Sequence, residues 1–297
     1  MGMIGTVGLV LHPQRDSKKA IDTILRWAGD NGSTVLGLPE EVGRIDCTAV
    51  PVDAVTLVER ADLLVGLGGD GTMLRTMRLL AGRPTPILGV NLGRLGFLAE
   101  IDVDDLAATL SAIDSHHYTI EPRMAIRSVV GGTEVTAFND IALVRIPGDG
   151  LAAVSVTPSG SPFVRYAADA VIVATTTGST AYSFSAGGPI VSPRVEAVLV
   201  VPAAAHSAFN RALVLPADEE VTLQVLPTSG RLAVEVDGRV VGHLCPGDTV
   251  HVAAWPGAAK VVRVGTTFYE RARRKLRVDG SAEVDWSAPE LSDQHHG

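Results

Sequence analysis

Gly68-Gly69-Asp70-Gly71-Thr72 is the stretch that decides the fold of this sequence, because it joins two segments of different periodicity. The apolar run before it, 61–67, predicts a buried strand, and residues 73–77 predict the start of a helix. The glycines allow positive φ angles and a close approach of the backbone to a ligand. Backbone N–H groups and the positive end of the helix would then face an anion. The stretch therefore predicts a phosphate-binding loop, with a plain glycine-rich turn as the alternative.

Asp70 adds a carboxylate to this predicted loop. A carboxylate beside bound phosphates either holds Mg²⁺ or accepts a proton from an attacking hydroxyl, and both roles belong to phosphoryl transfer. A short glycine motif does not by itself separate this function from a simple turn. The rest of the chain has to decide between them.

Composition limits the classes of protein to which the chain can belong. It has 297 residues, of which 46% are hydrophobic and 20% charged, so we expect a globular protein of two ordinary domains. The formal net charge of -8 argues against binding to nucleic acid or to an anionic membrane surface. Cys47 and Cys245 form no CxxC motif or Cys/His cluster, which indicates a reducing compartment and no structural zinc. No leader pattern or spanning apolar run is present, so we expect a cytoplasmic protein.

Strand and helix patterns alternate through the first 119 residues, which predicts a doubly wound, Rossmann-like α/β domain. The expected strands are 6–11, 34–38, 63–67 and 86–90, and the expected helices are 17–29, 53–61, 72–80 and 104–113. Sheets of this type bind ligands at the carboxyl ends of their strands. Residues 68–72 fall at such an end, where His12 also follows a strand and is expected as a turn or surface residue.

From residue 120 to 264 short alternating runs replace the helical spacing and predict a second, mostly β domain. Expected strands include 141–146, 154–157, 170–175 and 221–225. Asp237-Gly238, between the runs 232–236 and 239–241, predicts a tight hairpin. Residues 265–297 form a final segment, whose basic run 271–277 predicts a solvated face and whose tail, 287–297, we expect to be disordered.

Four polar or glycine-rich stretches stand out, each with a structural alternative. The loop 91–98 ends in Phe97-Leu98, which suit the core as well as a ligand contact. The hydroxyl-rich run 176–189 suits a polyhydroxylated ligand, although Ser179 and Thr180 also suit helix caps. Asn139-Asp140 is either an edge or turn pair or a grip on vicinal hydroxyls. Asp169, before an apolar strand, either ends that strand in solvent or points into a site.

Taken together, these stretches resemble the NAD kinase family along nearly the whole chain. Residues 68–72 resemble its GGDG signature, 91–98 its N-x-G-x-L-G-F-L loop, and 178–182 its GSTAY segment, continued by 185–189. Lipid kinases related to diacylglycerol kinase and phosphofructokinases carry loops like GGDG. The GSTAY segment in the β-rich domain is what distinguishes NAD kinases.

The resemblance implies phosphorylation of the adenosine-ribose 2′-hydroxyl of NAD to give NADP, with ATP or polyphosphate as donor and Mg²⁺ accompanying the donor. It implies that Asp70 activates the hydroxyl and that Gly68, Gly69, Gly71 and Thr72 bind the phosphate donor. It implies dinucleotide contacts by Phe97, Leu98, Asn139, Asp140, Asp169, Thr180, Ala181, Tyr182 and Ser185. It implies no dedicated metal cage, a β-sandwich second domain, a C-terminal segment packed back on the first domain, and a homodimer or homotetramer.

The sequence departs from the family pattern on the nicotinamide side. Asp140 replaces the usual Glu, which moves the carboxylate by about the 1 Å that can already affect catalysis. Ala168 and Ala170 flank Asp169 where the family has glycines, and Thr176 stands where it has proline. Two alternatives therefore stay open. One is a related kinase for another adenosine-containing or lipid acceptor, and the other is a dinucleotide-binding sensor without turnover.

Overall fold

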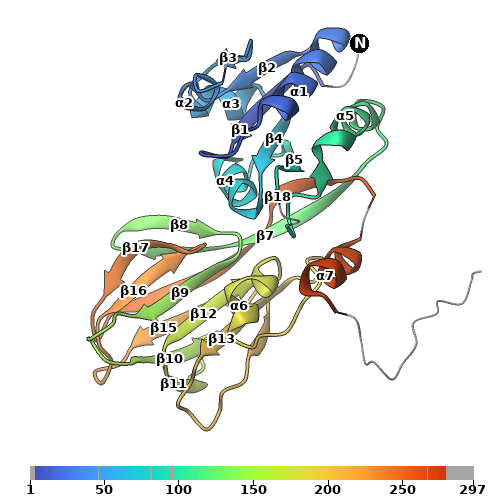
Figure 1. Ribbon diagram of the computed structural model, residues 1–297. Helices are drawn as coiled ribbons and strands as arrows, with labels where there is room; N and C mark the ends of the chain where they lie inside the picture. Colours follow the sequence, from blue (N-terminus) through green and yellow to red (C-terminus); the bar gives the residue numbers. More distant parts are fainter. Residues whose placement is uncertain (1–3, 46, 81, 94–95, 266, 279–297) are drawn as a thin grey trace, which may run out of the picture.

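The computed structural model describes residues 4–45, 47–80, 82–93, 96–265 and 267–278 (Figure 1). Within them the chain forms an α/β part and a mostly β part, as the sequence predicts, and the two parts pack end to end. The predicted disorder of the tail concerns residues outside those described. None of the described helices combines the length and the apolar character needed to span a membrane.

The first part is built on a parallel sheet with the strand order β3-β2-β1-β4-β5. Its strands are β1 (Thr6–Leu11), β2 (Thr34–Gly37), β3 (Val50–Pro51), β4 (Leu63–Gly68) and β5 (Pro86–Asn91), with the short β6 (Ile101–Asp102) beside β5. Burial on both faces explains their continuous apolar sequences. All four strands expected from the sequence are present, whereas the two-residue β3 and β6 were not expected because they are too short to show a pattern.

Helices cover both faces of this sheet (Figure 1). They are α1 (Lys18–Asn31), α2 (Pro39–Val42), α3 (Ala54–Arg60), α4 (Asp70–Leu80) and α5 (Leu106–Asp114), which the 3-10 turn η1 (Val103–Asp105) precedes. Apolar residues of α1 and α5 pack on one face, and those of α3 and α4 on the other. The helix α4 begins at Asp70, two residues before its predicted start. Asp70 is therefore part of the first helical turn.

The strand order reverses between β1 and β4, which lie side by side in parallel. At such a switch point the loops after the two strands diverge and leave a crevice for a ligand. His12 follows β1, and Gly69-Asp70 follows β4. The topology thus places the glycine-rich loop where the sequence predicts a ligand site.

The second part is a sandwich of two sheets. One contains β14-β13-β12-β9-β16-β17, and the other β11-β10-β15-β18 with β7 and β8. The strands are β7 (Thr119–Val130), β8 (Thr133–Ala137), β9 (Asp140–Arg145), β10 (Ala152–Pro158), β11 (Val164–Ala168), β12 (Ala170–Thr175), β13 (Ala197–Ala203), β14 (Leu213–Pro216), β15 (Val221–Val225), β16 (Leu232–Val236), β17 (Arg239–Leu244) and β18 (Thr249–Arg263). Their inward-facing residues form one apolar core. The predicted hairpin at Asp237-Gly238 is confirmed.

The long strand β18 joins the two parts. Its first half pairs with β15 in the sandwich, and Lys260 and Val261 pair in parallel with β5 of the first sheet. The strand β7 runs antiparallel beside it along most of its length. One continuous sheet therefore runs through both parts, which limits how far they can move relative to each other.

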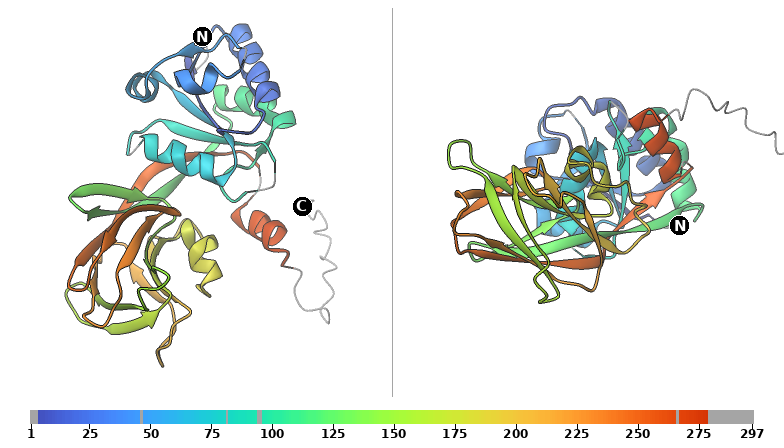
Figure 2. Two further views of the ribbon diagram at one scale, coloured as in Figure 1. Left: turned by 60° about the vertical axis from the view of Figure 1, so that its left-hand side comes forward. Right: turned by 90° about the horizontal axis from the view of Figure 1, so that it is seen from below.

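The helix α7 (Phe268–Leu276) lies at the junction of the two parts (Figures 1 and 2). Arg271 belongs to the run predicted to be solvated, yet its side chain is only 1% exposed and pairs with the buried Glu100. Arg263 also pairs with Glu100, at 3.0 Å, and with Glu121, which contacts the buried Arg123. The prediction is wrong for Arg271 because the buried carboxylate of Glu100, which is distant in the sequence, forms an ion pair with its guanidinium group.

Replacing Glu100 by Gln should destabilise the protein, because the guanidinium groups of Arg263 and Arg271 would lose their shared counter-charge. Loss of one partner from a buried ion pair costs about 3–5 kcal/mol, and urea unfolding would measure it. The exposed pair between Glu59 and Arg83 offers a matched control. Glu59→Gln should cost less than about 1 kcal/mol. Equal effects of the two substitutions would contradict a structural role of the buried cluster.

Candidate active site

The carboxylate of Asp70 is held by the backbone of the loop that follows β5. Its Oδ2 accepts the N–H of Phe97 at 3.1 Å, and its Oδ1 accepts the N–H of Leu98 at 2.9 Å. The loop can approach this closely because residue 96 is glycine, where a Cβ would overlap Oδ1. Two glycine-containing loops that are separate in the sequence therefore meet at one carboxylate.

A cation from the C-terminal helix also contacts Asp70. The Nζ of Lys275 lies 2.9 Å from Oδ2 and 4.4 Å from the centre of the Phe97 ring. Burial, the strongest single influence, acts to raise the pKa of Asp70. Lys275 and the N–H groups of Leu98 and Phe97 outweigh it and hold that pKa below its usual value. Asp70 is therefore an ionised carboxylate at neutral pH.

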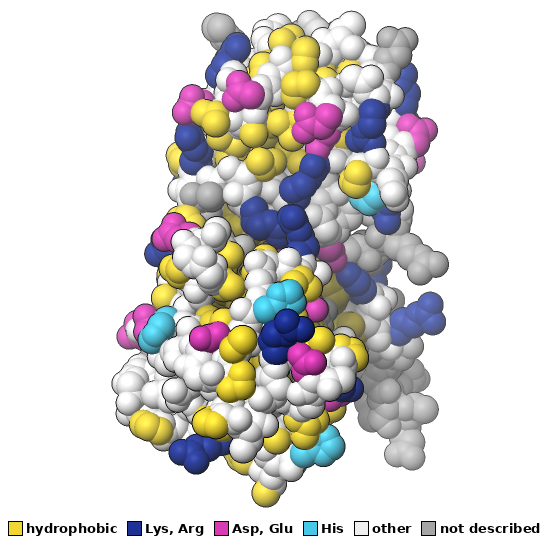
Figure 3. All heavy atoms as spheres, turned by 90° about the vertical axis from the view of Figure 1, so that its left-hand side faces the viewer, with side chains coloured by type: hydrophobic (Ala, Val, Ile, Leu, Met, Phe, Trp, Pro, Cys, Tyr) yellow, Lys and Arg dark blue, Asp and Glu magenta, His cyan; other side chains and the backbone are white. Residues whose placement is uncertain are grey.

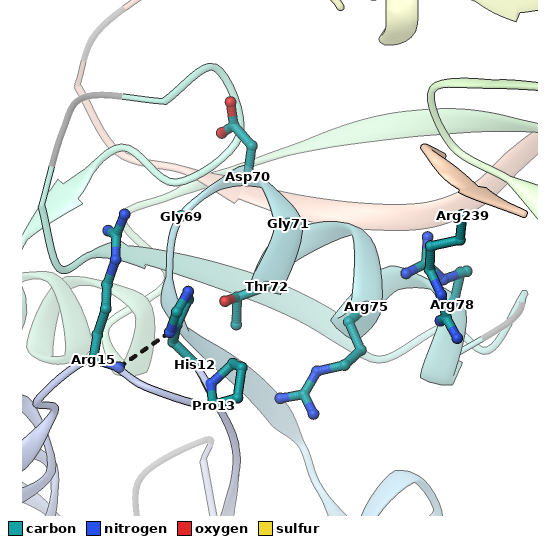
Figure 4. A pocket seen from close by; sticks show the side chains of 10 residues that line it. All are labelled: His12, Pro13, Arg15, Gly69, Asp70, Gly71, Thr72, Arg75, Arg78 and Arg239. Atoms are coloured by element: carbon teal, nitrogen blue, oxygen red, sulfur yellow. Dashed lines mark hydrogen bonds between the residues drawn. The ribbon is translucent and has the colours of Figure 1, made fainter. Parts of the chain in front are cut away.

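A cavity of about 410 Å³ opens beside the glycine-rich loop (Figure 4). Its described lining is rich in cationic side chains and consists of His12, Pro13, Arg15, Gly69, Asp70, Gly71, Thr72, Arg75, Arg78 and Arg239. Arg239 comes from β17, so both parts of the chain contribute. In Figure 4 the carboxylate of Asp70 is directed away from His12 and Thr72. Asp70 thus stands at one side of a strongly basic cavity.

The basic character of this cavity contrasts with the net charge of the chain, which is -8. On the face in Figure 3, Lys and Arg side chains gather midway between the upper and lower parts of the molecule. Clustered guanidinium groups recognise phosphate oxygens by charge-assisted hydrogen bonds. The first turn of α4 adds its N–H groups and the positive end of its dipole. This cavity is therefore suited to a phosphate chain.

The glycine-rich loop achieves this without the positive φ angles expected from its sequence. None of Gly68, Gly69 and Gly71 has a positive φ. Gly68 is the last residue of β4 and Gly71 lies within α4, so regular strand and helix geometry sets their backbones. A close backbone approach is found at a different glycine, Gly96, which lies against the Asp70 carboxylate.

His12 takes a defined orientation in the cavity, although the sequence suggests only a turn residue. Its Nδ1 accepts the N–H groups of Gln14 and Arg15, each at 3.1 Å, so Nε2 carries the proton of the neutral ring. Partial burial, followed by the charges of Arg15, Arg75 and Arg44, lowers the pKa of His12. His12 therefore acts as a neutral hydrogen-bond donor at physiological pH.

The loop that carries His12 is clamped by ion pairs from neighbouring helices. Glu41 of α2 is buried, accepts the N–H of Leu11 at 2.6 Å and pairs with Arg75 of α4. Arg75 also donates to the carbonyl oxygen of Leu11 at 2.5 Å. Arg44 donates to the carbonyl oxygens of His12 and Pro13. The geometry of the cavity thus depends in part on Glu41 and Arg44, which are not among its described lining residues.

Asp237 ties this cavity to the Asn139-Asp140 pair. Its side chain is fully buried and accepts the N–H groups of Phe138, Asn139 and Asp140 at 3.2, 2.7 and 3.3 Å. The same carboxylate forms an ion pair with Arg78 of α4, with 2.5 Å between Oδ2 of Asp237 and Nη1 of Arg78. One carboxylate therefore orients the polar pair of the second part and connects it to the helix of the glycine-rich loop.

Asp140 lies at the start of β9, an internal strand between β12 and β16, so the pair does not lie at a sheet edge, and Asn139 lies in the bend that joins β8 to β9. Its side chain is buried, and burial raises the pKa of Asp140 to about 7, with contributions from the charges of Asp237 and Glu235. A carboxylate that is costly to ionise gains from hydroxyl donors. Asn139 beside it is partly exposed.

The hydroxyl-rich run folds against the same pair. Thr175 donates its hydroxyl to the carbonyl oxygen of Phe138 at 2.6 Å and accepts the N–H of Gly178 at 3.0 Å. A Cβ on Gly178 would overlap the carbonyl oxygen of Asn139. Residues 178–185 then form the turn η2 (Gly178–Thr180) and the helix α6 (Tyr182–Ser185). The GSTAY segment and the Asn139-Asp140 pair are therefore adjacent.

Other predicted site residues lie in different environments. Thr180, Ala181 and Tyr182 are partly exposed and Ser185 is exposed, whereas Leu98 packs in the core and offers its N–H group to the site. Asp169 precedes β12, at the end opposite to the GSTAY segment, and pairs with Arg145 at 2.5 Å. Within one chain, the described lining of the basic cavity does not include Asp169.

The site residues that the sequence did not indicate come mainly from tertiary packing. They are His12, Arg15, Arg75, Arg78, Asp237, Arg239 and Lys275. Arg78 follows the glycine-rich loop on a helix, and Asp237 sits in a predicted hairpin turn, so their positions were known but their partners were not. Lys275 lies 205 residues from Asp70, and nothing in its local sequence marks the contact.

Comparison with known families identifies the class of protein to which this chain belongs. Residues 7–118 match the model of the ATP-NAD kinase N-terminal domain, and residues 138–264 match that of the ATP-NAD kinase C-terminal domain. Together the two models match well over half of the chain. The chain therefore belongs to the NAD kinase family.

Individual relatives agree with this assignment. NAD kinase 1 of Streptomyces avermitilis is 38% identical, over 95% of this chain and 93% of its own length. The NAD kinase of Gemmatimonas aurantiaca is 37% identical, over 97% of this chain and 98% of its own. Yeast NADH kinase, solved in complex with NADH, superposes with a TM-score of 0.82 at 25% identity, covering 94% of this chain and 89% of that one.

Replacing Asp237 by Asn should destabilise the junction, because an amide cannot accept three N–H groups and also neutralise Arg78. Asn keeps the size of the side chain and tolerates the positive φ of 47° at this turn. We expect a loss of about 3–5 kcal/mol in urea unfolding and faster hydrogen exchange at the amide of Asn139. Asp248→Asn, at an exposed turn where Asp248 accepts only the N–H of Cys245 in the described contacts, should change stability by about 0.5 kcal/mol or less.

The raised pKa of Asp140 makes a second prediction. Between the unfolded value of 3.8 and the folded value of about 7, the folded state binds the extra proton, so this group lowers stability as pH rises through that window. Asp140→Asn removes the titration. The variant should therefore gain about 2 kcal/mol relative to wild type between pH 5 and pH 8, measured by urea unfolding. If the free energies of unfolding of wild type and Asp140→Asn change in parallel between pH 5 and pH 8, Asp140 is ionised in the folded state and the prediction is wrong.

Proposed function

We propose that this chain transfers the terminal phosphoryl group of ATP to the 2′-hydroxyl of the adenosine ribose of NAD, forming NADP. The observation that carries the proposal is the position of Asp70. It is an ionised carboxylate at the first turn of α4, beside a cavity of arginines, and is held by the loop that contains Phe97. Membership of a family described as ATP-NAD kinase supports both substrates.

The basic cavity supports the assignment of the phosphate-donor site. We propose that the triphosphate lies against Gly68, Gly69, Gly71 and Thr72, where the N–H groups of α4 begin. Arg15, Arg75 and Arg239 would contact its oxygens, since all three side chains line the cavity. A chain of phosphates longer than three would meet the same groups, so polyphosphate is a second candidate donor.

The acceptor is proposed to bind across the junction of the two parts. Asn139 and Asp140 would hold the nicotinamide ribose, whose vicinal hydroxyls can donate to a carboxylate that otherwise lacks compensation for its burial. Thr180, Ala181, Tyr182 and Ser185 would contact the dinucleotide, and the Phe97 ring would line its adenine side. Asp169 remains a proposed contact near the carboxamide. This polar surface supports a dinucleotide rather than a lipid acceptor.

The chemistry follows from this arrangement. The 2′-oxygen attacks the terminal phosphorus, a new P–O bond forms, the bond to the bridging oxygen breaks, and ADP leaves. The 2′-hydroxyl proton passes to Asp70. Because such transition states involve little bond formation to the nucleophile, the main contributions are orientation of the hydroxyl and neutralisation of the phosphate charge. Because Asp70 is ionised, held in place and adjacent to the basic cavity, its site favours this activity over a sensor without turnover.

Magnesium fits this site as a companion of the donor. The described residues contain no group of three acidic, histidine or cysteine side chains placed to hold a metal. Asp70 is the one carboxylate in the described lining of the cavity, and its oxygens already accept two N–H groups. Phosphate oxygens and water would therefore supply most ligands, as is usual for Mg²⁺ with nucleotides. When bound, the ion would neutralise phosphate charge.

We further propose a cytoplasmic homodimer or homotetramer. The oligomeric state rests on the resemblance to NAD kinases, and the location on two unpaired cysteines, Cys47 and Cys245, which suit a reducing compartment. Sedimentation velocity of the purified protein would test the first point.

Asp70→Asn should lower kcat for NADP formation by about a thousandfold, because an amide cannot accept the hydroxyl proton. NADP would be measured with an NADP-specific dehydrogenase after incubation with ATP, Mg²⁺ and NAD. Asp22→Asn, at a partly exposed position of α1, should retain wild-type activity. If the folded wild-type protein forms no NADP, the proposed function is wrong, and a screen of other acceptors by ADP release would follow.

A further inference from the structure

The contact between Lys275 and Asp70 joins the last described helix of the chain to the first turn of α4. Lys275 is 32% exposed and Asp70 29% exposed, so both remain accessible to a ligand. In the proposed function, the Asp70 carboxylate accepts the proton of the reacting 2′-hydroxyl. The contact with Lys275 therefore bears directly on the state of that carboxylate.

We propose that Lys275 is a positioning residue for phosphoryl transfer, which fixes the orientation of the Asp70 carboxylate and keeps it ionised. The proposal rests on the proposed function. It makes α7 a required part of the active site, although this helix lies beyond the region matched by the C-terminal family model, which ends at residue 264.

The hydrogen bonds around Asp70 show how a third donor, Lys275, helps to fix the orientation of the carboxylate. The N–H groups of Phe97 and Leu98 belong to adjacent residues of one loop. Lys275 approaches Oδ2 from a separate helix, so the carboxylate is held from two elements. Oδ1 has one recorded donor and keeps a lone pair for the acceptor hydroxyl. A fixed carboxylate can then present that lone pair in one direction.

Lys275 is itself fixed by the way α7 is anchored. The helix starts with a capping box between Thr267 and Glu270, and Arg271 inserts into the buried cluster at Glu100. Arg271 and Lys275 are four residues apart and therefore share a face of the helix. The Lys275 ammonium also lies over the Phe97 ring. These contacts hold the ammonium group beside Asp70, so that little side-chain conformational entropy is lost when the ion pair forms.

The charges around Asp70 explain how Lys275 keeps this carboxylate ionised. Burial raises the pKa of Asp70, and among the groups that oppose it Lys275 is the largest contributor. The other titratable groups that line the neighbouring cavity are His12, Arg15, Arg75, Arg78 and Arg239. Figure 4 shows the carboxylate directed away from His12 and Thr72, so these groups do not replace Lys275 at Oδ2. Without Lys275, the largest contribution that opposes burial would be lost, and the pKa of Asp70 would rise.

The test is Lys275→Met, which keeps the length of the side chain and removes the charge. We expect kcat/KM for NAD at pH 7 to fall by about tenfold to a hundredfold, and the acid limb of its pH profile to move to higher pH. Lys275→Arg should restore most of the rate and the wild-type limb. Arg274→Met, on an exposed position of the same helix, controls for loss of a basic residue.

A second readout does not depend on turnover. Carboxyl ¹³C NMR, with Asp70→Asn identifying the Asp70 signal by difference, should show a higher pKa for Asp70 in Lys275→Met than in wild type. Thermal unfolding should confirm that the variant is folded.

The outcomes separate the inference from the proposed function. Active wild type with an unshifted acid limb in folded Lys275→Met overturns the inference alone. A faster Lys275→Met with a lower KM for NAD also overturns it, since Lys275 would then obstruct the acceptor. If wild type forms no NADP, the proposed function fails, and the NMR titration still decides whether Lys275 holds Asp70 ionised. If Lys275→Met does not fold, Lys275→Gln takes its place: a higher pKa of Asp70 in folded Lys275→Gln than in wild type supports the inference, and an unshifted Asp70 titration overturns it.

Discussion

The ion pair between Arg78 and Asp237 is the interaction on which the geometry of the site depends. Arg78 lies on the helix that starts at the glycine-rich loop, and Asp237 lies in a hairpin turn of the sandwich. Because the Asp237 carboxylate also accepts the N–H groups of residues 138–140, any shift of one part moves the polar pair relative to the loop. A fully buried charge is tolerated only when such partners surround it. The pair thus sets the distance between the proposed donor and acceptor sites.

A second constraint comes from β18 and α7. The strand β18 returns from the sandwich to the parallel sheet, and α7 follows directly from it. Buried charges on Glu100, Arg263 and Arg271 are satisfied only when this segment is docked. The active site is therefore completed by residues from the first helix turn after β4, the loop after β5 and the last helix. Asp70 acquires its environment only when the loop after β5 and the helix α7 have docked beside it.

Much of the architecture could be predicted from periodicity and turn residues. The four longer strands and the helices α1, α3, α4 and α5 of the first part, the hairpin at Asp237-Gly238 and the position of the glycine-rich loop follow from local patterns that burial reinforces. Two expectations were wrong for physical reasons. None of Gly68, Gly69 and Gly71 adopts a positive φ, because Gly68 ends a strand and Gly71 lies within a helix. Arg271 is buried because the distant carboxylate of Glu100 pairs with it. Local sequence carries no signal for partners that are far apart along the chain.

By itself, the sequence determined the fold class, the family resemblance and the residues that carry chemistry, because periodicity, turn types and short motifs are local properties. The tertiary structure alone decided which of these residues meet. It placed Lys275 on Asp70, Asp237 beneath Asn139 and Asp140, and four arginines around one cavity, and it separated Asp169 from that cavity. Charge pairing and burial across distant segments set these contacts, and they depend on packing that no single stretch of sequence specifies.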